Sequence, residues 1–342
     1  MPRVLITGGS GFLGTNISEY FIQHGWNVTS FDNLVRTGVE ENAKYMQNTY
    51  RDKYVLIRGD VRCTEDFNRL PKKIDAIINL AANPGIPWSI TNPIYDLHSN
   101  LNGAVNVLEY ARKIGACVIQ ASTNKVYSDI VNKLPMVEEE KRYRLLPPYE
   151  KGIPETFGID GLGSPKSPYG VSKSAADLYA QEYNSIFDVP TVVCRMSAIF
   201  GKRQLGVEDQ GWVVWFMYAK KHKKSLVIYG SGKQVRDLLY AEDLARLYYT
   251  LVRDIDVHRG RVLNVGGGVK STISVLELID WLNEKDGFKL EPTFEDWRLA
   301  DHKVYISDTT KVNEFWKPNR TMWEGLESTW EWLQSIDYEW VS

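Results

Sequence analysis

Arg3-Val-Leu-Ile-Thr7, followed directly by Gly8-Gly-Ser-Gly-Phe-Leu-Gly14, is the stretch that decides the fold of this chain. The apolar run predicts a short buried strand, and a helical pattern follows the glycines. In such a turn Gly8 permits a tight bend, Gly11 lets the backbone approach a pyrophosphate, and Gly14 lets the helix pack closely on the sheet. The stretch predicts a dinucleotide-binding unit, with glycines spaced G-x-x-G-x-x-G rather than as in the commoner fingerprint.

An acidic residue follows the second apolar run, where a ribose-binding carboxylate is expected. Asn27-Val-Thr-Ser-Phe31 ends directly before Asp32. A carboxylate at this place accepts hydrogen bonds from the adenosine ribose hydroxyls and repels the 2′-phosphate of NADP, so NAD is favoured over NADP. The alternative is that Asp32 is an ordinary turn residue, and Arg36 nearby could weaken the discrimination against a phosphate.

Strand-like apolar runs alternate with helical patterns through the first half of the chain. The runs are Arg3–Thr7, Asn27–Phe31, Tyr54–Ile57, Ala76–Leu80, Ala116–Ala121 and Thr191–Arg195. This alternation predicts βαβ units, and hence an α/β fold with a Rossmann-type, doubly wound parallel sheet. Residues that end these strands should lie at the carboxyl edge of the sheet, where such folds bind ligands. They include Asp60, Val61, Ala81, Ala82, Asn83, Ser122 and Thr123.

Tyr169 and Lys173 stand four residues apart, shortly after Pro168. In a helix this spacing puts the phenol and the ammonium on one face, where the lysine charge lowers the pKa of the tyrosine. A lowered pKa would let the phenol act as a base, since a free tyrosine has a pKa of about 10. The alternative is an ordinary start of an amphipathic helix, because Tyr-x-x-x-Lys alone is a weak motif.

Asn100 opens a further helical run that contains Ala104, Val107 and Leu108. An asparagine at the start of a helix is a common N-cap, because its side chain accepts a hydrogen bond from a free backbone N–H group. A part in a proton relay is the second interpretation, and the sequence leaves both open.

The composition describes a globular protein that can bury a large core. The chain has 342 residues, 43% of them hydrophobic, and a formal net charge of -2. Without a basic excess, nothing points to nucleic acid. The three cysteines, Cys63, Cys117 and Cys194, are far apart, which indicates neither a disulfide framework nor a metal site, and the last two lie in apolar runs typical of buried side chains. No membrane span is predicted, and a cytoplasmic location is the default expectation.

After about residue 196 the pattern changes to shorter elements, which predicts a smaller C-terminal α/β domain. Arg236 and Arg298 lie there in loop-like contexts, and two guanidinium groups on one pocket would suit a pyrophosphate, although arginines are more often solvated. An aromatic stripe at helical spacing is expected to pack this domain. The stripe consists of Trp323, Leu326, Trp330 and Leu333.

Several motifs together resemble the extended short-chain dehydrogenase/reductases that act on nucleotide sugars, and they stand in the order of that family. They are Gly8-x-x-Gly-x-x-Gly14, Asp32, Ser122-Thr123, Tyr169-x-x-x-Lys173, Arg236-Asp237 and Arg298-x-x-Asp301. The resemblance covers nearly the whole chain. It implies NAD as cofactor, a nucleotide-sugar substrate and a homodimer that pairs the helices after Asn100 and after Tyr169. The alternative to the dimer is that the second apolar face of such a helix is covered within the chain. One departure is Ala198, which stands where relatives have an asparagine that contacts substrate.

The resemblance also implies roles for single residues. Tyr169 is implied as the general base, Lys173 as the group that lowers its pKa and holds the nicotinamide ribose, and Thr123 as hydrogen-bond partner of the reacting oxygen. The implied cofactor-binding residues are Gly8, Gly11, Phe12, Leu13, Gly14, Asp32, Asn33, Arg36, Asp60, Val61, Leu80, Ala81, Ala82, Asn100, Tyr169 and Lys173. The implied substrate contacts are Thr123, Lys125, Gln234, Arg236 and Arg298. For Lys125 an exposed charge without a function is an equal alternative.

The expected division is a NAD-binding Rossmann domain in residues 1–195, with returning segments near 234–265, and mainly a nucleotide-sugar-binding domain in residues 196–342. Four stretches, 122–127, 201–204, 209–213 and 232–237, are most similar to family members that epimerise a CDP-hexose at carbon 2. The implied reaction is oxidation to a 2-keto intermediate and re-reduction from the opposite face.

Three other functions can be weighed against this reaction. Family members that are 4,6-dehydratases carry Asp-Glu after the threonine, whereas Asn124-Lys125 follows Thr123 here, which argues against dehydration. A carbon-4 epimerase of a UDP-hexose stays open, because the same three residues serve that reaction. A non-catalytic NAD-binding regulatory protein is the remaining alternative, although such proteins usually lose the tyrosine or the lysine.

Overall fold

The computed structural model describes residues 1–160 and 166–340, and its contacts group the chain into two compact units. The first unit consists of residues 1–123, 168–195 and 241–263, and the second of residues 124–167, 196–240 and 264–342. The sequence-based division places residues 124–167 in the first domain, whereas the contacts group them with the second unit. Each unit is therefore built from segments that are separated along the chain.

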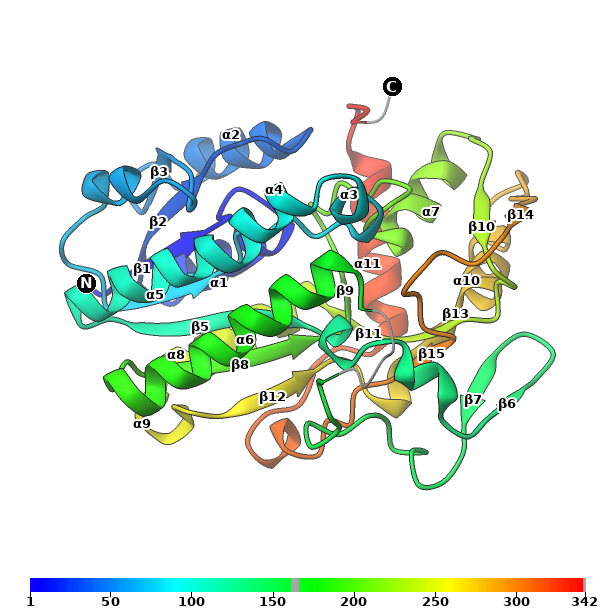
Figure 1. The fold of residues 1–342 in the computed structure, drawn as a ribbon. Helices are drawn as coiled ribbons and strands as arrows, with labels where there is room; N and C mark the ends of the chain where they lie inside the picture. Colours follow the sequence, from blue (N-terminus) through cyan, green and yellow to red (C-terminus); the bar gives the residue numbers. More distant parts are fainter. Residues whose placement is uncertain (161–165, 341–342) are drawn as a thin grey trace. The chain divides into compact units, whose positions relative to one another are not determined.

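A seven-stranded sheet forms the centre of the first unit and confirms the predicted α/β fold class (Figure 1). The strand order is β12-β8-β5-β4-β1-β2-β3, and Val4 of β1 pairs in parallel with Val28 of β2 and with Ala76 of β4. The strand order therefore reverses between β1 and β4, where such sheets bind their ligands. The bounds are β1 Arg3–Thr7, β2 Asn27–Asp32, β3 Tyr54–Arg58, β4 Ala76–Asn79, β5 Cys117–Thr123, β8 Thr191–Met196 and β12 Val262–Val265.

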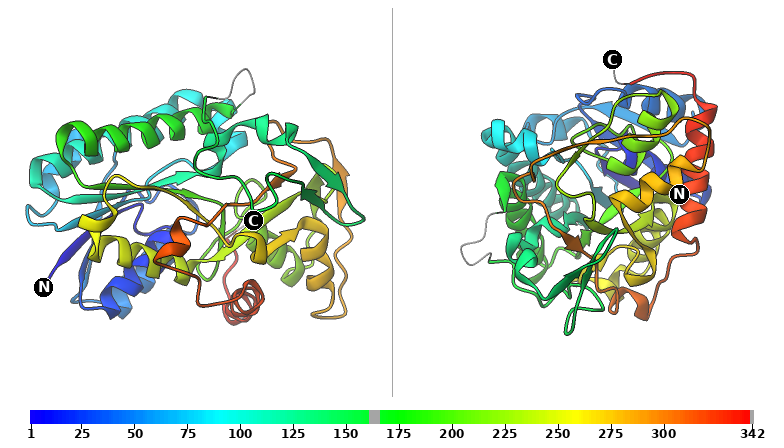
Figure 2. Two further views of the ribbon diagram at one scale, coloured as in Figure 1. Left: turned by 90° about the horizontal axis from the view of Figure 1, so that it is seen from below. Right: turned by 90° about the vertical axis from the view of Figure 1, so that its right-hand side faces the viewer.

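Helices cover both faces of this sheet (Figure 2). On one face lie α5 (Gly103–Ile114) and α6 (Ser167–Phe187), and on the other lie α1 (Phe12–Gln23) and α8 (Ala241–Arg253). Strands and helices bury a common core that includes Leu5, Ile77, Val107, Leu108, Val118, Ala180 and Tyr183. Shorter elements of the unit are α2 Val39–Thr49, α3 Ile86–Thr91, α4 Pro93–Leu97, α9 Ile255–His258, the 3-10 helix η1 Thr64–Arg69 and the π-helical turn η2 His98–Asn102.

In the second unit, β11 (Val235–Tyr240) is the central strand of a small sheet. It pairs antiparallel with β13 (Thr272–Ser274) and parallel with β15 (Val304–Tyr305) and β9 (Ala198–Phe200). Two further strand pairs are β6 (Met136–Glu138) with β7 (Tyr143–Leu145) and β10 (Val227–Tyr229) with β14 (Thr293–Glu295). The helices are α7 Trp212–Lys221, α10 Val275–Asn283 and α11 Met322–Ser335, with the 3-10 helices η3 Asn124–Tyr127, η4 Asp129–Lys133, η5 Val269–Ser271 and η6 Val312–Glu314.

The predicted aromatic stripe lies on α11, which begins with a capping box between Thr321 and Glu324. Leu326 and Leu333 are fully buried, and Trp330 packs against the same core, as predicted. The expectation for Trp323 is wrong, because 49% of this residue is exposed. Met322 takes the core position in the first turn of the helix, and the next residue is turned away by about 100°.

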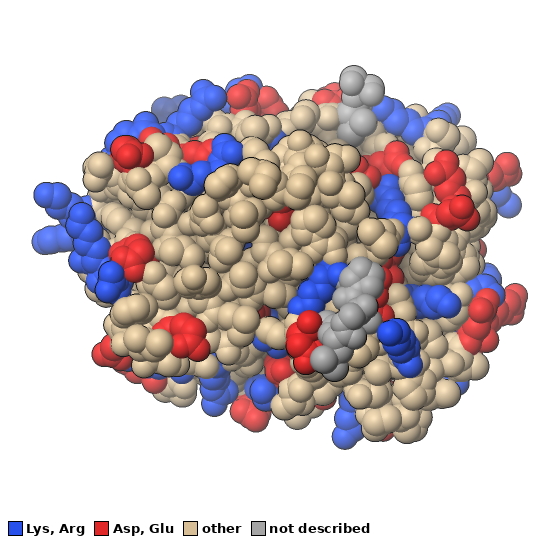
Figure 3. Space-filling view, in the orientation of Figure 1, with Lys and Arg blue, Asp and Glu red and all other residues tan. Residues whose placement is uncertain are grey.

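The surface and the cysteines agree with the composition. On the face seen in Figure 3, acidic and basic side chains are interspersed. Cys117 and Cys194 are buried, as predicted. Within residues 1–160 and 166–340, no helix combines the length and the apolar composition that crossing a bilayer requires. The same part of the chain contains no group of three or more His, Cys, Asp or Glu side chains suited to a metal ion.

Candidate active site

Thr123 and Tyr169 meet in the first unit through a hydrogen bond between their side chains. Thr123 is the last residue of β5, and Tyr169 lies in the first turn of α6. Lys173 lies one turn further along α6, and its Nζ donates to the carbonyl oxygen of Ala121 at 2.6 Å. Tyr169 and Lys173 therefore both contact the carboxyl end of β5.

The pKa values of Tyr169 and Lys173 are both shifted by burial. Burial raises the pKa of Tyr169 to about 12; the hydrogen bond from Thr123 opposes this rise, and the carboxylate of Asp96 adds to it. Burial lowers the pKa of Lys173 to about 8, against the attraction of Asp177 and Asp96. The expected lowering of the tyrosine pKa by Lys173 is not met in the structure. The ammonium is bound to the carbonyl of Ala121, and burial of the phenol dominates.

A buried network of hydrogen bonds surrounds Asn100. Its Oδ1 accepts the backbone N–H of Asn83 at 2.7 Å, and its Nδ2 lies 3.0 Å from Asp96 Oδ1 and 3.1 Å from Ser172 Oγ. The N-cap interpretation of Asn100 is wrong, because the helical backbone continues from α4 through η2 into α5 and Asn100 lies inside that turn. The proton relay stays a prediction.

The glycine turn after β1 has the geometry that its spacing predicts. Gly8 has a φ of +66°, which favours glycine, and its N–H donates to the carbonyl oxygen of Phe31 at 2.8 Å. A Cβ on Gly14 would lie 2.4 Å from the carbonyl oxygen of Gly8, so only glycine allows this close approach. The N-cap of α1 is Gly11, which has no side chain to cap the helix, and the first turn contains Phe12 and Leu13. Free N–H groups at a helix N-terminus suit a pyrophosphate.

Asp32, at the end of β2, is held beside this turn. Its carboxylate accepts the backbone N–H groups of Ser10 at 3.0 Å and of Leu34 at 2.9 Å. Burial raises the pKa of Asp32, while these two hydrogen bonds and the charge of Arg36 oppose the rise. A fixed acceptor next to a glycine turn is what the ribose of NAD requires.

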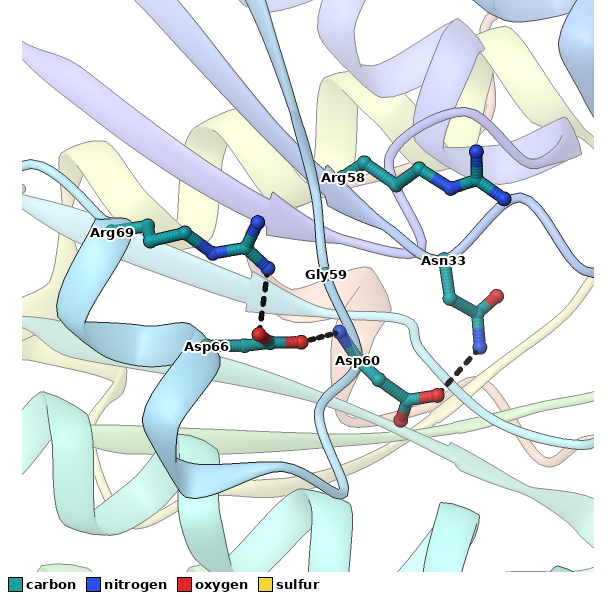
Figure 4. A pocket seen from close by; sticks show the side chains of 6 residues that line it. All are labelled: Asn33, Arg58, Gly59, Asp60, Asp66 and Arg69. Atoms are coloured by element: carbon teal, nitrogen blue, oxygen red, sulfur yellow. Dashed lines mark hydrogen bonds and ion pairs between the residues drawn. The ribbon is translucent and has the colours of Figure 1, made fainter.

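An open pocket of about 350 Å³ lies beside the end of β3 (Figure 4). Asn33 Nδ2 donates to Asp60 Oδ2 at 3.0 Å, and the backbone N–H of Asp60 donates to Asp66 Oδ2 at 2.8 Å. Burial raises the pKa of Asp60, but hydrogen bonds from Arg62 and Asn33 outweigh it and lower the pKa to about 2. Two of the predicted adenosine contacts thus lie together, and Val61 is buried next to them. The pocket is lined by Asn33, Arg58, Gly59, Asp60, Asp66 and Arg69.

The end of β4 packs against the glycine turn. The N–H groups of Leu80 and Ala81 donate to the carbonyl oxygen and the hydroxyl of Thr7, each at 3.2 Å. A Cβ on Gly8 would lie 3.1 Å from the nitrogen of Ala81. Leu80 and Ala81, and Ala82 directly after them, therefore follow β4 at the point where the strand order reverses. The turn, the held carboxylate and this edge fit a bound NAD.

Asp301 joins two of the predicted substrate residues within the second unit. Its Oδ1 accepts from Arg236 Nη2 at 2.6 Å and from Lys125 Nζ at 3.3 Å, and Lys125 also donates to the carbonyl oxygen of Ala300 at 2.9 Å. The interpretation of Lys125 as an exposed charge is wrong, because its side chain is only 11% exposed. Burial raises the pKa of Asp301, but the charges of Arg236 and Lys125 outweigh it and hold this pKa well below its usual range.

Arg298 has different partners in the same unit. Its Nη2 lies 3.0 Å from Asp209 Oδ1, and its guanidinium carbon lies 3.7 Å from the centre of the Tyr229 ring. Gln234 Nε2 donates to the carbonyl oxygen of Tyr229 at 2.9 Å, and Gln234 Oε1 is buried without a hydrogen-bond partner among the described residues. The meeting of Arg236 and Arg298 on one pyrophosphate stays a prediction.

Two buried carboxylates next to the tyrosine and the lysine were not predicted. Asp177 accepts from Ser122 Oγ at 2.6 Å and from Arg195 Nε at 2.9 Å. Its position one helical turn after Lys173 was a signal that could have found it. Asp96 has a partner one turn away in Asn100, but its shortest hydrogen bond joins it to Ser172, which stands 76 residues away in the sequence and could not be inferred from local spacing.

Comparison with known proteins agrees with this geometry. Residues 4–266 match the model of the NAD dependent epimerase/dehydratase family. A CDP-paratose 2-epimerase from Salmonella typhi is 35% identical over 345 residues, which cover 98% of this chain and 100% of that protein. A putative UDP-glucose 4-epimerase from Methanocaldococcus jannaschii is 26% identical, over 97% of this chain and 98% of that protein.

A solved structure of similar fold contains the cofactor that the glycine turn predicts. It is the UDP-glucose 4-epimerase of Thermus thermophilus in complex with NAD, with a TM-score of 0.79 and 26% identity over 98% of this chain and 100% of that one. The family match covers most of the chain, and the turn and Asp32 fit the cofactor. This chain is therefore an enzyme of the NAD dependent epimerase/dehydratase family, and its cofactor is NAD.

Proposed function

We propose that the enzyme epimerises a CDP-linked hexose at carbon 2 and so interconverts CDP-paratose and CDP-tyvelose. The observation that carries this proposal is the 35% identity to a CDP-paratose 2-epimerase along the full length of both chains. The hydrogen bond between Thr123 and Tyr169, with Lys173 one turn away, supports it, because this trio suits the reversible oxidation of a hydroxyl.

In the proposed mechanism Tyr169 takes the proton of the carbon-2 hydroxyl and later returns it. Thr123 donates a hydrogen bond to the reacting oxygen. Lys173 is mostly charged at neutral pH, since its pKa is about 8, and it holds the nicotinamide ribose. When bound, NAD supplies the hydride acceptor and donor and adds a positive charge that favours the phenolate. The sugar turns in its 2-keto form and is reduced on the opposite face.

The cofactor contacts are proposed from the arrangement around the glycine turn. The N-terminal turn of α1 binds the pyrophosphate, Asp32 binds the adenosine ribose, and the pocket beside β3 holds the adenine side. The full proposed set is Gly8, Gly11, Phe12, Leu13, Gly14, Asp32, Asn33, Arg36, Asp60, Val61, Leu80, Ala81, Ala82, Asn100, Tyr169 and Lys173.

The substrate contacts are proposed from the second unit and from Thr123. Arg236 and Arg298 bind the diphosphate, since the planar guanidinium suits phosphate oxygens. Asp301 and Lys125 hold Arg236 and its neighbouring loop in place. Gln234, whose buried side-chain oxygen has no hydrogen-bond partner among the described residues, is proposed as a further substrate contact.

A carbon-4 epimerase of a UDP-hexose is the second candidate, because the same trio serves that reaction and a putative 4-epimerase is among the relatives. Incubation of the NAD-loaded enzyme with CDP-tyvelose and, separately, with UDP-glucose distinguishes the two. We expect CDP-tyvelose to be converted and UDP-glucose to be unchanged. Conversion of UDP-glucose alone would replace the proposal by the second candidate.

The role of Tyr169 is tested by Tyr169→Phe, which keeps the ring and removes the hydroxyl. We expect the rate of epimerisation to fall by a factor of about 100 to 10,000, the usual contribution of a general acid or base, while NAD stays bound. Tyr45→Phe is the matched control, because its hydroxyl donates to Glu19 in a half-buried position outside the proposed site, and its rate should stay near that of the wild-type enzyme. An active Tyr169→Phe enzyme would exclude the proposed mechanism.

We also propose a homodimer formed through α5 and α6, and a cytoplasmic location. Large apolar side chains stay exposed along α6, and charged side chains are sparse over α5 and α6 in Figure 3. Apolar groups gathered on one face favour burial against a partner. The exposed residues of α6 are Val171, Leu178, Tyr179, Ile186 and Phe187.

A further inference from the structure

Asp96 of α4 is an acidic residue with none of its surface exposed. Its Oδ2 accepts the hydroxyl of Ser172 at 2.6 Å, and its Oδ1 accepts the side-chain amides of Asn83 and Asn100, both at 3.0 Å. Burying a carboxylate is costly, even where hydrogen bonds offset part of the cost. An apolar residue at this place would avoid the cost, so the carboxylate points to a role in holding its hydrogen-bond donors together.

The three donors come from three separate segments of the first unit. Asn83 lies in the turn after β4 and follows Ala82, one of the residues proposed to line the cofactor, in the sequence. Asn100 lies in η2, and its Nδ2 is also 3.1 Å from Ser172 Oγ. Ser172 stands on α6 between Tyr169 and Lys173, and its hydroxyl lies 3.1 Å from the carbonyl oxygen of Tyr169. One carboxylate thus connects the cofactor side of the site to the helix that carries the acid-base pair.

The charges around Asp96 are few. Burial raises the pKa of Asp96, and Lys173 of α6 is the charged group that opposes this rise. The carboxylates of Asp177 and Asp96 favour the charged form of Lys173, whereas Asp96 disfavours the phenolate of Tyr169. The groups that contact Asp96 from the turn after β4, from η2 and from α6 are neutral, namely Asn83, Asn100 and Ser172.

We infer that Asp96 is a positioning residue of the reaction, which fixes the start of α6 against the turn after β4 through Ser172, Asn83 and Asn100. It acts through Tyr169 and Lys173 and touches neither the sugar nor the cofactor in this account. The inference rests on the proposed function in that these two residues form the acid-base pair, and it is independent of which sugar is the substrate.

Two variants test the inference by different routes. Asp96→Asn removes the charge at nearly constant shape, and Ser172→Ala removes one hydrogen bond and keeps the charge. In both, kcat for CDP-tyvelose should fall roughly tenfold to 100-fold, because small displacements of catalytic groups have effects of this size. KM should stay within about twofold, since the substrate contacts proposed above are intact.

The dependence of kcat on pH distinguishes a positioning role of Asp96 from a general loss of stability in the variants. In Asp96→Asn the acid limb of the kcat profile should move to lower pH, because the phenolate of Tyr169 loses an unfavourable neighbour. In Ser172→Ala the limb should stay in place. Asp243→Asn is the matched control: this carboxylate is also buried, but it pairs with Arg246 on α8, and kcat and the limb should not change.

A measurement without any substrate keeps this inference separate from the proposed function. The ionisation of Tyr169 can be followed by its ultraviolet absorbance during a pH titration. Subtracting the titration of Tyr169→Phe from that of the wild-type protein isolates Tyr169 with Asp96 intact. The same subtraction between the double variant, Asp96→Asn combined with Tyr169→Phe, and Asp96→Asn isolates it without the carboxylate. A lower pKa of Tyr169 in Asp96→Asn supports the inference even if no tested sugar is converted, an outcome that would remove only the proposed function. The inference is overturned if Asp96→Asn changes neither kcat nor the ionisation of Tyr169. If Asp96→Asn fails to fold, a wild-type kcat in Ser172→Ala overturns it.

Discussion

Gly14 lets α1 approach the turn after β1 more closely than any other residue would allow. A Cβ at this position would lie 2.4 Å from the carbonyl oxygen of Gly8, so Gly14→Ala has to push the helix away from the turn. We expect a loss of about 1–3 kcal/mol in the free energy of unfolding, as for other overpacked sites, and weaker binding of NAD. Urea unfolding and calorimetric titration with NAD measure the two effects.

Gly287→Ala is the control for this change, because a Cβ there meets nothing within 4 Å. It should leave both the unfolding free energy and the affinity for NAD near the wild-type values. If Gly14→Ala bound NAD as the wild-type protein does, the close approach of α1 would not matter for the cofactor.

Lys125 offers a second test at the scale of a residue. Lys125→Met removes an ammonium that donates to the carbonyl oxygen of Ala300 and to Asp301, while the stem of the side chain keeps its volume. We expect a loss of about 1–3 kcal/mol in the free energy of unfolding, the usual cost of breaking hydrogen bonds to a charged group, and a higher KM for the nucleotide sugar.

Lys141→Met is the matched control for Lys125. Lys141 pairs with Asp280 on the surface, where the two side chains are 51% and 52% exposed, so the loss should stay below about 0.5 kcal/mol. Equal losses in the two variants would show that the buried position of Lys125 has no special effect.

The proposed catalytic side chains could be predicted from the sequence, but the environment that surrounds them could not. Thr123, Tyr169 and Lys173 could be selected because they stand in the order of the motifs that the chain shares with its family, whereas Tyr-x-x-x-Lys alone is a weak signal. The direction of the tyrosine pKa could not be predicted, since it depends on how deeply packing buries the phenol. Asp96 was missed because two of its partners, Asn83 and Ser172, lie 13 and 76 residues away in the sequence, and its spacing of four residues from Asn100 does not by itself indicate a buried carboxylate.

On the scale of elements, α6 carries both the proposed acid-base pair, Tyr169 and Lys173, and the proposed dimer contact. Leu178→Asp places a charge in the exposed apolar row, where it would be buried without a partner in a dimer. We expect the variant to be a monomer in analytical ultracentrifugation at concentrations where the wild-type protein is a dimer.

Val257→Asp controls for the charge itself, because Val257 is also exposed but lies on α9. This variant should remain a dimer. A wild-type protein that sediments as a monomer at every concentration would remove the proposed dimer.

Element boundaries followed from the sequence where hydrophobic pattern and turn residues agree. The run Asn27–Phe31 became β2, which ends at Asp32, and the run Thr191–Arg195 became β8, which ends at Met196. The pattern failed at Asn100, because the helical backbone passes through a π-helical turn there instead of starting anew. An asparagine that caps a helix and an asparagine inside a helical turn can have the same neighbours in the sequence. Only the structure therefore distinguishes the two positions for Asn100.

On the scale of the whole molecule, the chain passes between the two units several times. Residues 124–167, directly after the strand that ends in Thr123, belong to the second unit. The chain returns to the first unit at residue 168. The division expected from the sequence, residues 1–195 with returning segments near 234–265, differs from the contact-based units in placing residues 124–167 in the first domain, because no change in the sequence pattern marks that crossing. The fold class itself followed from the βαβ alternation and is confirmed by the seven-stranded parallel sheet.

The position of the reaction on the sugar is the central claim, and an isotope label tests it most directly. CDP-tyvelose with deuterium at carbon 2 is incubated with the NAD-loaded enzyme, and the product is analysed by NMR and mass spectrometry. We expect CDP-paratose that retains the deuterium at carbon 2, because the same bound NAD takes the hydride and returns it to that carbon. Loss of the deuterium to water, or inversion at carbon 4 with the label at carbon 2 untouched, would contradict it.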